Sequence, residues 1–187
     1  QYAIKGMHFN LYLKNKFLLY AYGKYFWYLE YTNASQIIAA YEGDKLLGVI
    51  IVDMKNEAKP YKSFWKTCYI KLIDQIQKFF FKGGVMAYNQ ANKEMFEEYT
   101  EKYTPDGEIR FLAADPDTKL KGIGTMLLNE FERRKYGKEI YLFTDDQCSY
   151  PFYEHRGFER IGEKDIVLEL DDKINLKCFL YRKLIQK

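Results

Sequence analysis

Residues 119–124 read Lys-Leu-Lys-Gly-Ile-Gly and join two apolar segments of different periodicity. The segment before them, Ile109 to Ala114, is typical of a buried strand, and the segment after them, Ile123 to Arg134, has helical spacing. The first N–H groups of a helix have no intrahelical acceptor, and the helix dipole places partial positive charge there. Glycines let a ligand's oxygens approach the main chain, and the lysines add charge. We therefore predict that a pyrophosphate-bearing cofactor binds Lys119, Leu120, Lys121, Gly122, Ile123, Gly124 and Thr125. Taken alone, a Gly-x-Gly motif is equally compatible with an ordinary tight turn.

Two longer segments resemble signatures of the GNAT superfamily of N-acetyltransferases. In the first, residues 111–128, a strand ends in small apolar residues and is followed by Pro116 and a glycine-containing loop that opens a helix. In the second, a strand leads to a short helix that carries Phe152-Tyr153 shortly before Gly157-Phe158. The resemblance is clear between Glu108 and Glu169. Lys119 stands where the family usually has Arg or Gln, and Asp146 where many members have Asn.

The resemblance implies transfer of an acetyl group from acetyl-CoA to a primary amine by direct nucleophilic attack. It further implies that the pantetheine arm of the cofactor lies along Leu112, Ala113 and Ala114, as an added strand would. Tyr153 matches the family's tyrosine and is our candidate general acid for the leaving thiolate. Glu108 is our candidate general base, because many members carry a carboxylate in this neighbourhood that acts through water.

Several alternatives stay open. Asp145 and Asp146 are further candidates for the base, although each is more typical of a solvated loop carboxylate. An acyl-enzyme on Cys148 is another route, but direct attack by an amine needs no such step. As an alternative to an enzyme, the chain would be a non-catalytic GNAT-like module that binds CoA or a partner. A P-loop protein is disfavoured because the motif lacks the Gly-Lys-Ser/Thr ending.

The composition limits the classes of partner that we expect for this protein. The chain has 187 residues, 48% hydrophobic and 29% charged, with a net charge of +3, and no block of basic residues predicts nucleic-acid binding. Three distant cysteines predict free thiols, and two distant histidines predict no metal site. The sequence has no apolar run of membrane-spanning length and no signal-peptide pattern, so we expect a cytoplasmic protein without a membrane partner. The expected partner is a small-molecule or peptide amine, and a homodimer is an option because the family often pairs.

Periodicity and turn chemistry predict a mixed, largely antiparallel twisted sheet of about six to seven strands with helices on both faces, an α/β (α+β) fold. We expect one GNAT-like domain over residues 1–187. Helices are predicted at residues 17–30, 63–81, 89–103, 123–134 and 151–156, and strands at 36–41, 46–53, 109–114, 140–144, 160–170 and 175–182. Residues 3–13 suit a strand followed by a turn, Gly83-Gly84 is expected to end the second helix, and residues 171–173 are expected to form the last turn.

Residues 55–104 form a helical insertion that is longer than the family usually needs before the cofactor strand. Its first helix is rich in aromatic residues, with Lys62, Lys66, Lys71 and Lys78 predicted on the opposite side. The insertion would supply acceptor specificity or a subunit contact, or it would simply pack on the sheet as core. A membrane-surface helix is a third interpretation.

Overall fold

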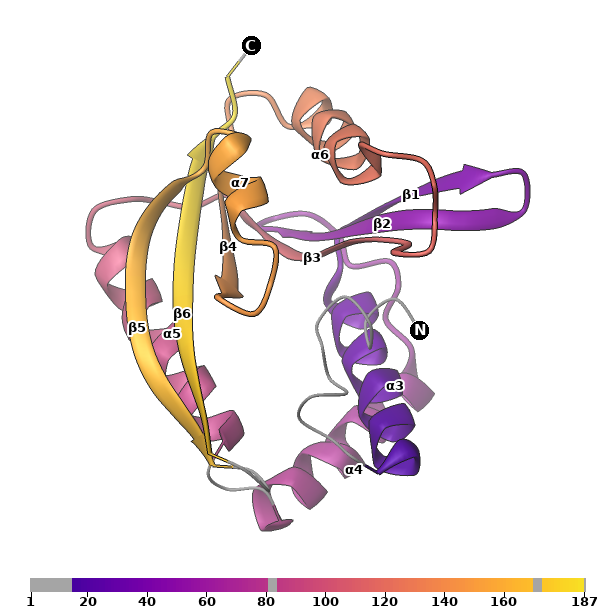
Figure 1. The fold of residues 1–187 in the computed structure, drawn as a ribbon, viewed down its shortest axis with the longest axis vertical. Helices are drawn as coiled ribbons and strands as arrows, with labels where there is room; N and C mark the ends of the chain where they lie inside the picture. The colour runs from indigo at the N-terminus through magenta and orange to yellow at the C-terminus, as the bar shows by residue number, and fades with distance from the viewer. Residues whose placement is uncertain (1–14, 81–83, 170–172, 187) are drawn as a thin grey trace.

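The computed structural model describes residues 15–80, 84–169 and 173–186. Helices and strands alternate along the chain (Figure 1). In order they are α3 (Lys16–Asn33), β1 (Gln36–Glu42), β2 (Lys45–Met54), α4 (Phe64–Phe80), α5 (Gly84–Thr100), β3 (Gly107–Ala114), α6 (Ile123–Arg134), β4 (Glu139–Asp145), α7 (Pro151–His155), β5 (Glu159–Glu169) and β6 (Lys173–Leu184). The strand expected at residues 3–13 and the centre of the last expected turn, residues 171–172, lie outside the described residues.

The described strands form one six-stranded sheet in the order β1-β2-β3-β4-β6-β5. Every neighbouring pair is antiparallel except β3 and β4, which run parallel. The predicted mixed, largely antiparallel sheet is therefore confirmed. Most of its strands were expected within one or two residues of their observed ends, because each alternates or clusters apolar residues between turn signals.

The parallel pair is joined only at its start. Gly107 pairs with Ile140 and Glu108 with Tyr141, and no later residue of β3 pairs with β4. The two strands then diverge, so that the sheet opens between them (Figure 1). Among the described strands, only β2 therefore pairs with the carboxyl-terminal half of β3.

A β-bulge lies opposite the junction of Ile51 and Val52. Val52 pairs with Ile109 and Ile51 with Phe111, which leaves Arg110 as the extra residue. A bulge turns two successive side chains to one side of the sheet. Arg110 accordingly bonds to α3, while the Phe111 ring packs edge-on against Phe26 of the same helix at 5.5 Å.

Helices cover both faces of the sheet, as expected (Figure 1). On one face, α6 packs over β1, β2 and β3, and side chains of α7 join the same apolar cluster around Phe131 and Tyr181. On the other face, α3 covers the β1–β3 half through Phe26, and α5 covers β5 and β6 through Met95 and Tyr99. Within the described residues, no helix has both the length and the apolar composition needed to cross a bilayer.

The insertion departs from its prediction in two respects. Helix α5 begins at Gly84, not at Asn89, so this glycine opens a helix instead of ending the previous one; Gly83 lies outside the described residues. Helix α4 packs against α3, and the ammonium group of Lys66 lies 4.5 Å from the centre of the Tyr31 ring, on the packed side. Much of the aromatic surface of α4 points to solvent instead, including Phe64 and Trp65.

Candidate active site

The amino-terminal end of α6 carries unpaired main-chain donors. Gly122 is the N-cap, with φ 81° and ψ 9°, a left-handed conformation that glycine adopts without strain. It offers no side chain to cap the helix, and the first turn contains no acidic residue. The first intrahelical bond runs from Met126 N–H to the Gly122 carbonyl at 2.9 Å. In the described part of the chain, the N–H groups of Ile123, Gly124 and Thr125 therefore meet no acceptor, which is the arrangement that binds anions.

The loop before α6 is held by a hydrogen bond and an ion pair at its start, and it presents exposed lysines near its end. The N–H of Asp115 donates to the Leu47 carbonyl at 2.7 Å, and its buried carboxylate pairs with Lys45 at 2.9 Å. Lys119 and Lys121 are exposed and form no ion pair within the described residues. Their charges are thus available beside the unpaired donors.

Close packing holds the start of α6 against the sheet. Ile123 is buried, and a Cβ placed on Gly48 of β2 would lie 2.8 Å from its Cγ2 atom. The absence of a side chain at Gly48 therefore lets α6 approach the sheet. Gly124, one residue further, faces the Phe152 ring of α7, which would lie 3.5 Å from an added Cβ.

The open edge of β3 leads directly to this helix end. Leu112, Ala113 and Ala114 pair with Ile50, Val49 and Gly48 of β2, and no described strand pairs with their other edge. Ala114 is exposed, and the Leu112 side chain packs on the α6 face of the sheet. The predicted cofactor residues thus form one continuous path, from an unpaired strand edge to an uncapped helix.

Tyr153 lies on the same face of the sheet as α6. Its ring centre is 5.3 Å from that of Phe152, 5.6 Å from that of Phe158 and 6.2 Å from that of Tyr181. Burial raises the pKa of its phenol, and nearby Cys148 raises it further, so the group is protonated at neutral pH. The hydroxyl has no hydrogen-bond partner among the described residues. It is nevertheless not fully enclosed, because the fully buried polar side-chain atoms without a partner in these residues belong to Gln36 and Asn92. Its proton is therefore free to be donated to a ligand.

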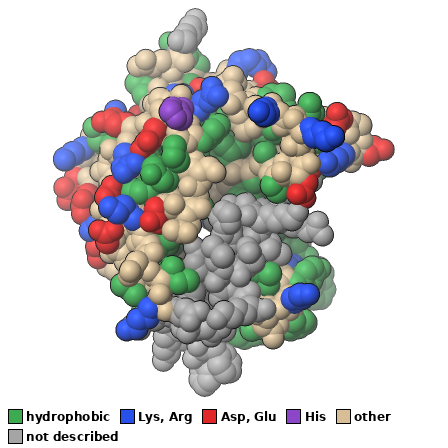
Figure 2. Space-filling view, viewed as in Figure 1, with side chains coloured by type: hydrophobic (Ala, Val, Ile, Leu, Met, Phe, Trp, Pro, Cys, Tyr) green, Lys and Arg blue, Asp and Glu red, His purple; other side chains and the backbone are tan. Residues whose placement is uncertain are grey.

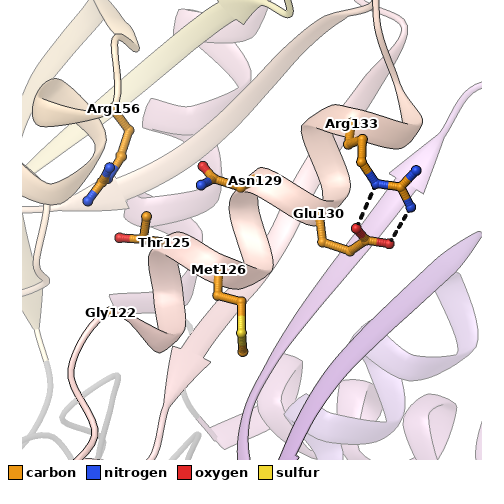
Figure 3. A pocket seen from close by; sticks show the side chains of 7 residues that line it. All are labelled: Gly122, Thr125, Met126, Asn129, Glu130, Arg133 and Arg156. Atoms are coloured by element: carbon orange, nitrogen blue, oxygen red, sulfur yellow. Dashed lines mark hydrogen bonds and ion pairs between the residues drawn. The ribbon is translucent and has the colours of Figure 1, made fainter.

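A shallow hollow of about 560 Å³ lies along the outer side of α6. Gly122, Thr125 and Asn129 line it from the helix, and Arg156 extends toward the same side of α6 from the end of α7 (Figure 3). Glu130 and Arg133 also line the hollow and are paired with each other, since Arg133 Nε donates to Glu130 Oε2 at 2.9 Å. The hollow begins at the uncapped end of the helix, so a ligand anchored there has room to extend along α6.

Glu108 lies on the opposite face of the sheet from Tyr153, in a network of charges. Its Oε2 atom accepts hydrogen bonds from Arg110 Nη1 at 3.1 Å and from the Tyr141 hydroxyl at 3.4 Å. Arg110 Nε also donates to Glu30 of α3 at 2.6 Å. Burial raises the pKa of the Glu108 carboxyl, and the Arg110 charge opposes this only in part. Burial raises the pKa of the Glu30 carboxyl in the same way.

The other candidates for catalysis have structural roles. Asp145 is buried, contrary to the expectation of a solvated carboxylate, and accepts from the Gln147 N–H at 3.0 Å in the turn after β4. Asp146 is exposed and accepts from the Lys177 N–H at 3.3 Å. Burial and the neighbouring Asp145 raise the pKa of the Cys148 thiol to about 12, which disfavours the nucleophilic thiolate. All three cysteines are free, as predicted.

The residues that fix the position of Glu108 were not predicted from the sequence. Arg110 carried a signal, because it interrupts an apolar strand, and Glu30 carried one, because it lies in an aromatic helix segment. A buried charge in such a position is usually paired. The pairing itself was not visible, since the bulge that turns Arg110 toward α3 depends on the register of β2 with β3.

Comparison with known proteins agrees with this geometry. Residues 8–158 match the model of the acetyltransferase (GNAT) family. No curated protein matches the chain. Similar solved structures include the C-terminal condensation domain of Ebony in complex with β-alanyl-dopamine, with a TM-score of 0.52, 10% identity and coverage of 97% of this chain and 88% of that chain. Two others are an N-acetyltransferase from Staphylococcus aureus Mu50 (TM-score 0.43, 14% identity, 80% and 67% coverage) and the ribosomal-protein-alanine N-acetyltransferase from Brucella melitensis (TM-score 0.44, 12% identity, 79% and 67% coverage).

At these identities the structural matches bear on the fold alone, and the family follows from the match over most of the chain. The six-stranded mixed sheet is the fold that the sequence signatures implied, and its opening between β3 and β4 is a finding of the structure. The chain is an acyltransferase that belongs to the GNAT family of acetyltransferases.

Proposed function

We propose that this protein transfers the acetyl group of acetyl-CoA to a primary amine by direct attack of the amine on the thioester. The single observation that carries the proposal is the continuous path from the unpaired edge of β3 to the uncapped start of α6. CoA has a matching sequence of groups, since its amide-containing pantetheine arm leads to a diphosphate. An extended chain with amides can pair with a free strand edge, and a diphosphate suits unpaired N–H groups at a helix end.

Each part of the path has a proposed role. The N–H groups of Ile123, Gly124 and Thr125 bind the diphosphate, with added charge from Lys119 and Lys121. Main-chain groups of Leu112, Ala113 and Ala114 pair with the pantetheine arm, and an N–H in this segment polarises the thioester carbonyl. The hollow along α6, with Arg156 beside it, accommodates the nucleotide end of CoA.

Tyr153 is the proposed general acid. During transfer a C–N bond forms to the acetyl carbon, the C–S bond breaks, and the departing sulfur takes the phenolic proton. An unbonded, protonated hydroxyl on the α6 face of the sheet suits this role, because no competing hydrogen bond must first be broken.

Glu108 is the proposed general base, and it acts through water on the ammonium form of the acceptor. Its raised pKa makes it a better proton acceptor than an exposed glutamate, while Arg110 and Tyr141 fix its position. The acceptor would then approach from the α3 face, and the acid would act from the α6 face. This division keeps the two proton transfers apart.

A screen of amine acceptors with detection of released thiol tests the proposal. Acetylation of at least one amine class, dependent on Tyr153, would support it. Binding of CoA without transfer to any small amine or peptide would instead favour a non-catalytic CoA-binding module. The predictions of a cytoplasmic location and of a single domain over residues 1–187 accompany this proposal.

A further inference from the structure

Helix α4 has an apolar side that the rest of the described protein does not cover. Trp65, Cys68, Leu72 and Ile76 follow one another at intervals of three or four residues, which places them on one side of the helix. Trp65 is 80% exposed, Leu72 59% and Ile76 40%. We refer to these four residues, together with Phe64 (74% exposed), as the α4 outer face.

The side of α4 that is next to α3 already has its partner. Ile70 is buried, and the Tyr69 hydroxyl donates to the Ala21 carbonyl of α3 at 3.2 Å. The Tyr69 ring also meets Tyr28 of α3 edge-on, with ring centres 5.5 Å apart. The α4 outer face is therefore not needed to attach the helix to the fold, and its exposure requires another explanation.

The charges in the sequence of the α4 segment are almost all positive. Between Lys62 and Lys82 the sequence contains five lysines and a single acidic residue, Asp74. Asp74 is engaged, because it accepts a hydrogen bond from the Tyr25 hydroxyl at 2.6 Å. Lys62 and Lys71 are exposed and form no ion pair within residues 15–80, 84–169 and 173–186. Where described side chains are visible at the α3–α4 end of the molecule, apolar and basic ones lie next to one another (Figure 2).

This combination favours one occupant over the others. A second copy of the chain, docked through the same face, would bring lysines against lysines across a two-fold axis. An anionic membrane surface instead attracts the lysines, whose long side chains can extend to the headgroups. Trp and Phe prefer the boundary between headgroups and acyl chains, and Leu and Ile insert below it.

We propose that the α4 outer face binds the surface of membranes that contain anionic phospholipids. The helix lies flat in the interface, with Trp65, Leu72 and Ile76 in the acyl boundary and Lys62 and Lys71 at the headgroups. This reverses the composition-based expectation of no membrane partner. The interaction does not depend on acetyl transfer, so it can be tested whether or not the proposed reaction is confirmed.

The test is flotation of the full chain with vesicles of phosphatidylcholine, with and without phosphatidylserine. We expect binding only when phosphatidylserine is present. In the Trp27→Phe variant, Trp65 is the remaining tryptophan, and its emission should shift to the blue on addition of the anionic vesicles. The Leu72→Gln/Ile76→Gln variant should lose flotation. The Lys62→Gln/Lys71→Gln variant should partition about 25-fold more weakly, at about fivefold per lysine.

Matched controls replace exposed residues elsewhere. Tyr41→Ser removes an exposed aromatic side chain from β1, and Lys93→Gln/Lys102→Gln removes two charges from the α5 region; both variants should still float. Because all altered side chains of α4 are exposed, thermal melting of the α4 variants should match that of their parent. Absence of flotation with either vesicle, equal flotation with both, or flotation that survives Leu72→Gln/Ile76→Gln would overturn the proposal. So would a dimer in solution that Leu72→Gln/Ile76→Gln dissociates, because the face would then join two copies.

Discussion

At the scale of single residues, Gly122 and Gly124 have different functions at the start of α6. Gly122 supplies the left-handed N-cap, where any other residue would cost about 1–2 kcal/mol of strain. Gly124 has an ordinary helical position whose nearest neighbour is the Phe152 ring. Backbone strain therefore does not explain its lack of a side chain, whereas the proposed approach of a diphosphate to the helix end would.

This difference yields a prediction for Gly124→Asp. A carboxylate in the first turn favours the helix dipole, so the melting temperature should hold or rise. The same carboxylate repels a diphosphate, so the affinity for CoA should fall by at least about a hundredfold, a loss of about 3 kcal/mol. Calorimetric titration with CoA and thermal melting measure the two effects. Gly124→Ala is the control, since its Cβ would make ordinary contact with Phe152, and it should retain most of the affinity. Equal CoA affinity in the Asp variant would exclude a diphosphate at this helix end.

Tyr153→Phe separates chemistry from binding. The phenol makes no hydrogen bond to the described protein, so its removal should leave stability and CoA affinity nearly unchanged. Loss of the general acid should lower kcat about a hundredfold or more. Steady-state kinetics with any acceptor found in the amine screen measures both parameters. A variant with unaltered kcat would remove Tyr153 from the mechanism.

Glu108 predicts the acid limb of the pH profile. The base must be deprotonated to act, and burial raises its pKa, so kcat/KM should fall with decreasing pH at values above the ordinary glutamate pKa of 4.5. Stability has the opposite sign. A raised carboxyl pKa favours folding below the unfolded-state value and loses that contribution as pH rises through the folded-state value. Glu108→Gln should lower activity and abolish this limb, whereas Glu57→Gln, at an exposed site, should keep it. An acid limb that persists in Glu108→Gln would assign the base to another group.

The sequence indicated which residues are candidates for the site, but it did not indicate the contacts that position them. Tyr153 and the segment proposed to bind the cofactor could be singled out as candidates because local motifs contain them. The fixed position of Glu108 could not, because its partners Arg110, Glu30 and Tyr141 come from three different elements. Pairing across elements depends on register and packing, which a single sequence does not display.

At the scale of elements, α6 was predicted with its observed bounds, Ile123–Arg134. Its apolar residues follow helical spacing, and a glycine marks its start. The boundary between α4 and α5 was misjudged because Gly84 was taken as a helix end, although the following residues favour a helix. The lysines of α4 were expected together on one side, but Lys66 stacks on Tyr31 because its long apolar stem can pack beneath its charge.

The contribution of the packing of α6 against the sheet to stability can be measured. Phe131 is fully buried beneath the helix, whereas Met126 on the same helix is 51% exposed. Phe131→Ala should lower the free energy of unfolding by about 3–5 kcal/mol. Met126→Ala should change it by less than about 0.5 kcal/mol. Urea denaturation of both variants checks this, and similar losses in the two would show that α6 is not anchored as described.

At the scale of the whole molecule, the site exists because the sheet opens. Sequence reasoning identified the strands but not that β6 lies between β4 and β5, nor that β3 and β4 pair at only two positions. Parallel pairing is nonlocal, since the strands are separated by the whole of α6 and its loops. The opening leaves Leu112 to Ala114 unpaired on one edge and directs them toward the α6 helix end.

Binding of the CoA diphosphate by the main chain of α6 is the central claim, and an amide NMR titration tests it most directly. Addition of CoA should shift the N–H resonances of Ile123, Gly124 and Thr125 far more than those elsewhere in α6. Pantetheine, which lacks the diphosphate, should leave these three resonances in place while it shifts those of Leu112 to Ala114. Saturating CoA that leaves the three amides unshifted would contradict the account.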